Sequence, residues 1–217
     1  MVKTIEELIS SERLEGYRSY SHNHLDARLI RYNYNIEMSR SFYAPLNILE
    51  VSLRNTLHKA FSDYLKDQHW LLKYESHPII QKSEQHKIRE AVDKLIRKKR
   101  TLEDCRIIAE LSFSFWVNLY DRPYLEIHKS NIRTQFPEAT NSQRDIFKIK
   151  KSLREIRNLR NRIFHYEPIW HWTNLGTYHH QIKELISWMN RDLLLKSFSD
   201  SERDIEELLK RQEIMLK

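Results

Sequence analysis

Apolar residues recur every three or four positions along most of the chain, which is the spacing of one face of an α-helix. The pattern predicts a helix over 25–42 that carries Leu29, Tyr32 and Ile36 on one side. It resumes after Pro45 and continues to about residue 65. Because proline lacks an N–H donor, we expect Pro45 to interrupt or restart the helix.

The same spacing predicts several further helices. Thr4 and Glu7 form a capping box that begins a short helix ending near residue 10, and a second short helix carries Leu14. Residues 66–78 are expected to form a connector with a partly buried Trp70. Further helices are predicted over 79–99, 105–120, 174–196 and 200–215, with short helical pieces and turns over 124–141.

One more helix is predicted from residue 141 or 142 to about His165, where the following Pro168 stops it. At about 100° per residue, one side of this helix is apolar and must face the core. The residues of that side are Ile149, Leu153, Ile156, Leu159 and Ile163. The opposite side is a polar stripe of Arg154, Asn158, Asn161 and His165. Arg160 lies about 140° from His165, nearer the edge of the core.

Composition narrows the class of protein. The chain has 217 residues, which fits one domain, and its two glycines argue against a β-rich fold. A single cysteine, Cys105, excludes an intrachain disulfide and a cysteine-based zinc site and fits a reducing, cytoplasmic location. We see no signal peptide and no apolar stretch as long as a membrane span. The net charge of +7 favours an anionic partner such as nucleic acid.

The richest chemistry lies in the stretch from Arg157 to Tyr166. Arg160 and Asn161 are followed by His165, in the order Arg-Asn-x-x-x-His. An arginine can stabilise negative charge on a phosphate, and a histidine can move protons near neutral pH. Together these groups could cleave RNA without a metal ion.

This motif resembles the R-x4-H motif of the HEPN superfamily, many of whose members are metal-independent ribonucleases. Three further segments resemble the Abi-like (abortive infection) branch of that superfamily, namely 11–17, 49–55 and the aromatic stretch 113–120. The resemblance runs from about residue 10 to about residue 195. It implies an all-α, HEPN-like helical bundle that forms a homodimer. We therefore expect one domain over 1–217, with 198–217 as a C-terminal helical extension, either an appendage or a dimerisation arm.

The resemblance also implies roles for individual residues. His165 would act as general acid or base, Arg160 would stabilise the transition state, and Asn161 would orient the phosphate or the imidazole. Three arrangements could bring Arg160 to His165: a distortion of the helix near His165, a long arginine side chain that wraps round the helix, or a site shared across a dimer. HEPN ribonucleases generally build this site at a dimer interface, which implies the third. Residues expected to support the site or bind substrate are Glu50, Arg54, Asn55, Arg154, Arg157, Asn158 and Tyr166. No cofactor and no metal are expected.

In this family such an enzyme would be a growth-arresting toxin or phage-defence effector, restrained by an antitoxin that is a small RNA or a protein. One rival is a catalytically silent HEPN module that binds RNA or a nucleotide. Another is an interaction protein whose basic helices bind an acidic partner, and this rival would not bind RNA in a salt-sensitive way.

Several residues keep a plainer interpretation open. Glu50 and Arg54, four residues apart on one helix, could simply form an ion pair. Trp170 and Trp172 could offer a stacking platform for a base, or could pack in the core or an interface. The spacing of His171, His179 and His180 fits no strong zinc pattern. His58, His69, His77 and His86 are expected at the surface.

Overall fold

The computed structural model describes residues 3–19, 23–197 and 201–216, and these residues contain helices and no β-strand. The expected all-α class is confirmed. In chain order the α-helices are α1 (Ile5–Ile9), α2 (Ser11–Glu15), α3 (Leu25–Leu65), α4 (Lys82–Arg97), α5 (Asp104–Glu110), α6 (Phe113–Asn118), α7 (Leu125–Gln135), α8 (Ile146–Phe164), α9 (Leu175–Met189), α10 (Arg191–Ser197) and α11 (Ser201–Met215). Two 3₁₀ turns, η1 (Tyr74–Ser76) and η2 (Arg122–Tyr124), precede α4 and α7.

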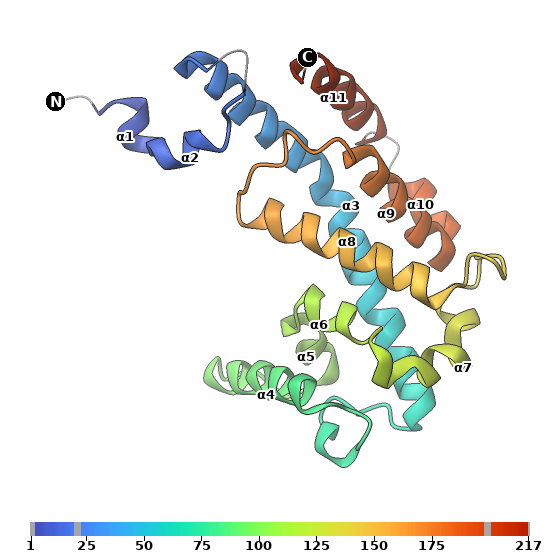
Figure 1. Cartoon of the computed structure of the whole chain (residues 1–217). Helices are drawn as coiled ribbons and strands as arrows, with labels where there is room; N and C mark the ends of the chain where they lie inside the picture. Colours follow the sequence, from blue (N-terminus) through green and yellow to red (C-terminus); the bar gives the residue numbers. More distant parts are fainter. Residues whose placement is uncertain (1–2, 20–22, 198–200, 217) are drawn as a thin grey trace.

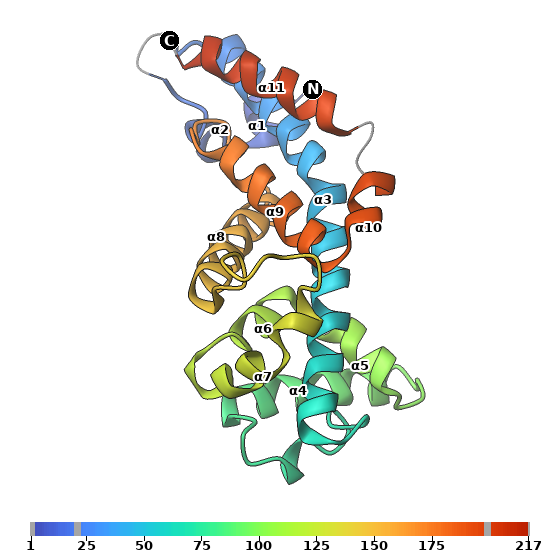
Figure 2. The same ribbon diagram turned by 90° about the vertical axis from the view of Figure 1, so that its right-hand side faces the viewer.

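Helix α3 is the central helix and extends from one end of the molecule to the other (Figures 1 and 2). Helices α8, α9, α10 and α11 surround its first half, while α4 to α7 gather around its second half (Figure 1). The prediction that Pro45 would break this helix is wrong, because α3 is continuous over 41 residues. A proline inside a helix costs ~3 kcal/mol. Phe42, Leu46 and Leu49 on either side of Pro45 are buried, and their packing outweighs that cost.

The core is one continuous cluster rich in aromatic side chains. Trp70 and Trp116 are fully buried within it, so the connector packs far more deeply than the partial burial predicted for Trp70. Phe61 of α3 contacts the Trp70 ring with the centroids 5.1 Å apart. This contact anchors the loop after α3. The spacing of apolar residues within the loop does not predict that Trp70 is buried.

Some predicted boundaries also need correction. The single helix expected over 105–120 is two helices, because the Ser112 side chain accepts from the N–H of Phe115 and starts α6 anew. The helix expected over 174–196 likewise divides at Asn190, whose side chain accepts from the N–H of Leu193. Helix α8 begins at Ile146 and not at 141–142, since Asp145 caps the N–H groups of Phe147 and Lys148.

The two chain ends are tied to the bundle. The capping box of Thr4 and Glu7 is present. The final helix, α11, packs against α3 and α9. The Tyr34 hydroxyl donates to the carbonyl oxygen of Leu208 at 2.8 Å, and the buried Gln212 donates to two loop carbonyls after α8. Asp200, where this helix was expected to start, lies outside the described residues. Among those residues no helix is long and apolar enough to cross a membrane.

Candidate active site on helix α8

Helix α8 buries the side that its sequence pattern predicted. Its five apolar residues, Ile149, Leu153, Ile156, Leu159 and Ile163, are all buried. The helix packs on α6, α7 and α9. The polar residues of α8 therefore lie on its solvent-facing outer surface and on the two flanks between that surface and the buried side. The two flanks contact different parts of the protein.

One flank, which we call the Arg160 flank, faces α3. The guanidinium Nε of Arg160 lies 3.5 Å from a carboxylate oxygen of Glu50, and only 25% of the Arg160 side chain is exposed. Its guanidinium carbon also stands 4.3 Å from the centroid of the Phe164 ring, a cation–π contact. Tyr43 of α3 in turn stacks on Phe164 with centroids 6.0 Å apart. The buried Nε atom of Arg160 has no hydrogen-bond partner among the described residues, so an ion pair with Glu50 and the aromatic face of Phe164 hold the cation.

Glu50 therefore pairs across two helices and not along its own. The ion pair considered between Glu50 and Arg54 is absent among the described residues. The Arg54 Nε atom is buried and has no hydrogen-bond partner there, and Asn55 of the same helix is exposed. Glu50, which was expected to support the site, contacts the motif helix through Arg160. The orientation of Arg54 depends on packing that local spacing does not encode.

The outer surface of α8 carries a row of cations. The carboxylate of Asp121, just after α6, accepts from Arg154 at 2.7 Å and lies 3.0 Å from the Lys150 ammonium. Arg157 donates to the side-chain oxygen of Asn118 at 3.1 Å. Two of the predicted phosphate ligands, Arg154 and Arg157, are therefore tied to the end of α6. Neither Asp121 nor Asn118 was predicted, because nothing in their spacing links them to α8.

His165 occupies the first position beyond α8, and its ring is exposed. Its backbone N–H still donates to the carbonyl of Asn161 at 2.9 Å. Within the described ranges, no hydrogen bond or ion pair reaches the side chains of His165, Asn161 or Asn158. These groups face solvent and are free to bind a ligand.

The end of α8 has a well-defined geometry. Tyr166 has a φ of 57°, in the left-handed region, and the N–H of Glu167 donates to the carbonyl of Arg162 at 2.8 Å. These are the features of a Schellman motif, which normally places glycine at the left-handed position. Arg13 of α2 donates to the carbonyl oxygen of Tyr166 and helps to hold it. The Tyr166 ring is 76% exposed.

Beyond this point the chain folds back onto the bundle. Gly16 lies so close to Pro168 that an added Cβ would meet the proline ring at 2.7 Å. This approach lets the indole of Trp170 enter the core and donate to the carbonyl of Gly16 at 3.0 Å. Trp172 instead remains half-buried beside the polar stripe. The two interpretations left open for this pair thus separate, since only Trp172 borders open space.

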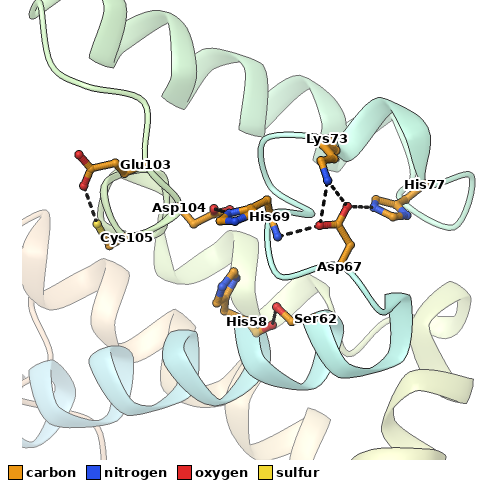
Figure 3. A network of polar contacts seen from close by, with 9 residues as sticks. All are labelled: His58, Ser62, Asp67, His69, Lys73, His77, Glu103, Asp104 and Cys105. Carbon is orange, nitrogen blue, oxygen red and sulfur yellow. Dashed lines mark hydrogen bonds and ion pairs between the residues drawn. The ribbon is translucent and has the colours of Figure 1, made fainter.

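A second polar cluster lies away from α8, between the connector and α5 (Figure 3). His69 and Asp104 are 2.6 Å apart, and Asp67 lies between Lys73 and His77 (Figure 3). His58 is half-buried against Trp70, contrary to the expected surface position, and this burial lowers its pKa. In the parts of the chain that the structure describes, no His, Cys, Asp and Glu side chains form a group suited to a metal.

Comparisons with known proteins identify no relative, since no protein-family model, no curated protein and no solved structure matches the chain. Any function must therefore be inferred from these residues themselves.

Proposed function

We propose that the protein is a metal-independent endoribonuclease of the HEPN type, and that its active site is assembled from two copies of the chain. The observation that carries the proposal is the pairing of a held cation with a free imidazole at one helix end. Arg160 is fixed by Glu50 and Phe164, while His165, five residues later, is exposed. Pre-positioned charge and an accessible proton carrier are what phosphodiester cleavage by the 2′-hydroxyl needs.

The cleavage would use groups of the substrate and of the protein alone. His165 of one copy removes the proton of the 2′-hydroxyl, and the 2′-oxygen forms a bond to phosphorus. The bond from phosphorus to the 5′-oxygen breaks, and His165 of the second copy, protonated, donates to that oxygen. Arg160 pairs with the negative charge that gathers on the phosphoryl oxygens. The products are a 2′,3′-cyclic phosphate and a 5′-hydroxyl.

Two copies are invoked because one chain separates the reacting groups. Arg160 belongs to the flank that faces α3, whereas His165 belongs to the outer surface about 140° away on an ideal helix. Beside this flank lies a groove of about 620 Å³ between α3 and the end of α8. Four large apolar side chains line it and remain at least 40% exposed, namely Ile36, Tyr43, Phe164 and Tyr166. An exposed apolar set of this kind supports a protein interface next to the motif.

The resemblance to Abi-like proteins supplies the biological side of the proposal. The enzyme would be a toxin or abortive-infection effector that cleaves cellular or phage RNA in the cytoplasm. An antitoxin, either a small RNA on the basic surface or a protein, would hold it inactive. Growth arrest on expression of the wild type, lost with His165→Ala, would support this role.

The second candidate is a catalytically silent module that binds RNA or a nucleotide. One observation favours it: the Arg160 guanidinium is already engaged by Glu50 and Phe164 within a single chain. If those contacts persist in the assembled protein, the arginine cannot reach a phosphate, and binding without cleavage would result.

The deciding experiment is cleavage of a labelled RNA by purified protein in EDTA, with analysis of the product ends. We expect cyclic phosphate ends from the wild type and a loss of ~10²–10⁴-fold in rate for His165→Ala. The matched control is His180→Ala, which removes an exposed histidine of α9 whose side chain lies 3.6 Å from Glu184. Cleavage that requires a divalent metal, or that survives in His165→Ala, would overturn the proposal. Binding without any cutting would favour the silent module.

A further inference from the structure

A groove lies on the side of α8 opposite to the Arg160 flank, where the chain folds back after the motif. Its volume is about 660 Å³, within the ~300–1,000 Å³ typical of ligand pockets. It is lined by Asn158, Asn161, Arg162, Glu167, His171 and Trp172. A second hollow of about 380 Å³ lies on the other side of Trp172, against Tyr178. The indole thus forms a wall between two open spaces.

The indole of Trp172 is held firmly although it is only half-buried. The Arg162 guanidinium stands 5.1 Å from its ring centroid, and the Tyr178 ring lies 5.9 Å away. The backbone is fixed from a distant part of the chain, because Gln212 of α11 donates to the carbonyls of Trp172 at 3.0 Å and Trp170 at 2.6 Å. Because the Arg162 guanidinium lies over the ring, a base that enters the groove stacks on the guanidinium or takes its place on the indole. The fixed backbone lowers the entropy lost on binding.

The electrostatics of the groove favour an uncharged ligand. Arg162 is neutralised by Glu167, whose carboxylate oxygen lies 3.2 Å from the guanidinium Nε. Partial burial and the positive charge of Arg162 lower the pKa of His171 from its ordinary value, although the residue as a whole is exposed. The groove therefore lacks the net positive charge that would attract a phosphate, in contrast to the row of cations along the outer surface of α8.

The remaining polar groups offer hydrogen bonds of both kinds. Asn158 and Asn161 each present an N–H donor and a carbonyl acceptor, and neither side chain has a partner among the described residues. They lie three residues apart, so both carboxamides project from one side of α8, as does His165. A carboxamide matches the adjacent donor and acceptor of an adenine edge, N6 and N7.

We propose that this groove is a nucleobase subsite that takes an unpaired adenine of the RNA chain, stacked on Trp172 and read by Asn158 and Asn161. The inference rests on the proposed ribonuclease function, because the adenine is taken to come from the RNA substrate. It adds to that function a preference for adenine beside the cleavage site. Single-stranded RNA is recognised by stacking of splayed bases on aromatic or guanidinium planes with hydrogen bonds to their edges. Because the two carboxamides share a helix side with His165, the adenine belongs to a nucleotide next to the scissile phosphate.

The test measures binding separately from cleavage. Full-length protein carrying His165→Ala is titrated with labelled, fully 2′-O-methylated oligo(A), oligo(U) and oligo(C), which cannot be cut by 2′-hydroxyl attack. We expect oligo(A) to bind most tightly. Stacking of one base is worth ~1–3 kcal/mol, so Trp172→Ala should weaken oligo(A) binding about 5- to 150-fold, while Trp172→Phe keeps most of it. Asn158→Ala and Asn161→Ala should level the preference for oligo(A) over oligo(U).

The matched control is Asn141→Ala, which removes a carboxamide that bonds to Arg144 at 3.2 Å in the loop before α8. The melting temperature of every variant is measured, and Trp172→Phe keeps the test valid if Trp172→Ala fails to fold. Equal binding of the three oligonucleotides, or an oligo(A) preference that survives in folded Trp172→Ala and Asn158→Ala, would overturn the subsite. If adenosine competes as strongly as oligo(A), the groove binds a free nucleoside, and the proposal that its base comes from an RNA chain is overturned.

Cleavage by the wild type separates this inference from the proposed function. If the wild type cuts RNA in EDTA but its preferred positions do not change in Trp172→Phe, Trp172→Ala and Asn158→Ala, the subsite fails and the ribonuclease stands. If the wild type never cuts but its oligo(A) preference depends on Trp172, the subsite stands and the ribonuclease fails.

Discussion

The two flanks of α8 differ in how far their polar groups are buried and paired. On the Arg160 flank the cation is enclosed by Glu50 and Phe164 and is mostly covered. On the opposite flank Asn158 and Asn161 have no partner among the described residues, and Trp172 is left half-exposed. Fixed charge suits the stabilisation of a transition state, whereas free donors and acceptors suit the reading of a ligand. One helix thus separates the candidate for transition-state stabilisation, Arg160, from a candidate specificity side that also carries His165.

The largest expected effect comes from breaking the first flank. We expect Arg160→Ala to lower the cleavage rate ~10²–10³-fold, because it removes a pre-positioned donor to the phosphoryl oxygens. Glu50→Gln should cost about tenfold, since it leaves the guanidinium present but less well oriented. Rates are measured under single-turnover conditions.

Arg133→Ala is the control for the loss of one charge, because Arg133 is exposed on α7. If Glu50→Gln instead raises the rate, Glu50 restrains Arg160 and the silent-module candidate gains support. A double variant shows whether the two residues act together, since a shared function predicts less than the product of the single losses.

Low pH should lower the stability of the fold itself. This loss must be measured separately from any effect of pH on either flank of α8. Burial lowers the pKa of His179 from its ordinary 6.5 to about 4, with Lys183 adding to the shift. The folded state therefore binds fewer protons than the unfolded state, and stability falls as the pH drops from about 6.5 towards 4. This one residue accounts for about 3 kcal/mol of that loss. Chemical denaturation at pH 7.0 and 4.5 measures it.

His179→Leu should remove the part of this acid sensitivity that His179 contributes, whereas His86→Leu, at an exposed position on α4, should leave it unchanged. The pKa values of His58 and His128 are also lowered by burial, so some acid sensitivity will remain in the variant. An unchanged difference between the two pH values in His179→Leu would contradict the prediction.

A smaller effect is expected where the two flanks meet at the end of the helix. Tyr166 adopts a left-handed conformation that costs a non-glycine residue ~1–2 kcal/mol. Glycine removes this cost but loses more entropy on folding, so Tyr166→Gly should stabilise the protein by about 0.5 kcal/mol. Tyr166→Ala keeps the strained backbone and should not stabilise. If both variants destabilise equally in urea, the exposed ring contributes to an interface.

The same helix shows which features its sequence could predict. Its buried side and its polar outer surface follow from a period of 3.6 residues, and both were predicted correctly. The pairing of Arg160 with Glu50 joins residues 110 positions apart, and packing alone decides that Arg54 is left out. Trp170 and Trp172 lie in a loop, where no period applies. Gly16 and Gln212, from the two ends of the chain, decide which indole is buried. The groove could therefore not be predicted from local spacing.

Another small effect is expected at the row of cations on the outer surface of α8, between the two flanks. The Asp121 carboxylate lies within 3.0 Å of Lys150 and 2.7 Å of Arg154, so it neutralises part of the row. Asp121→Asn should free both cations and raise the affinity of the His165→Ala protein for single-stranded RNA a few-fold. The plot of log K against log salt should steepen by ~0.7 for each phosphate gained. Glu126→Gln, which frees Lys129 on α7, is the control. An unchanged salt slope in Asp121→Asn would mean that RNA does not follow this surface between the two flanks.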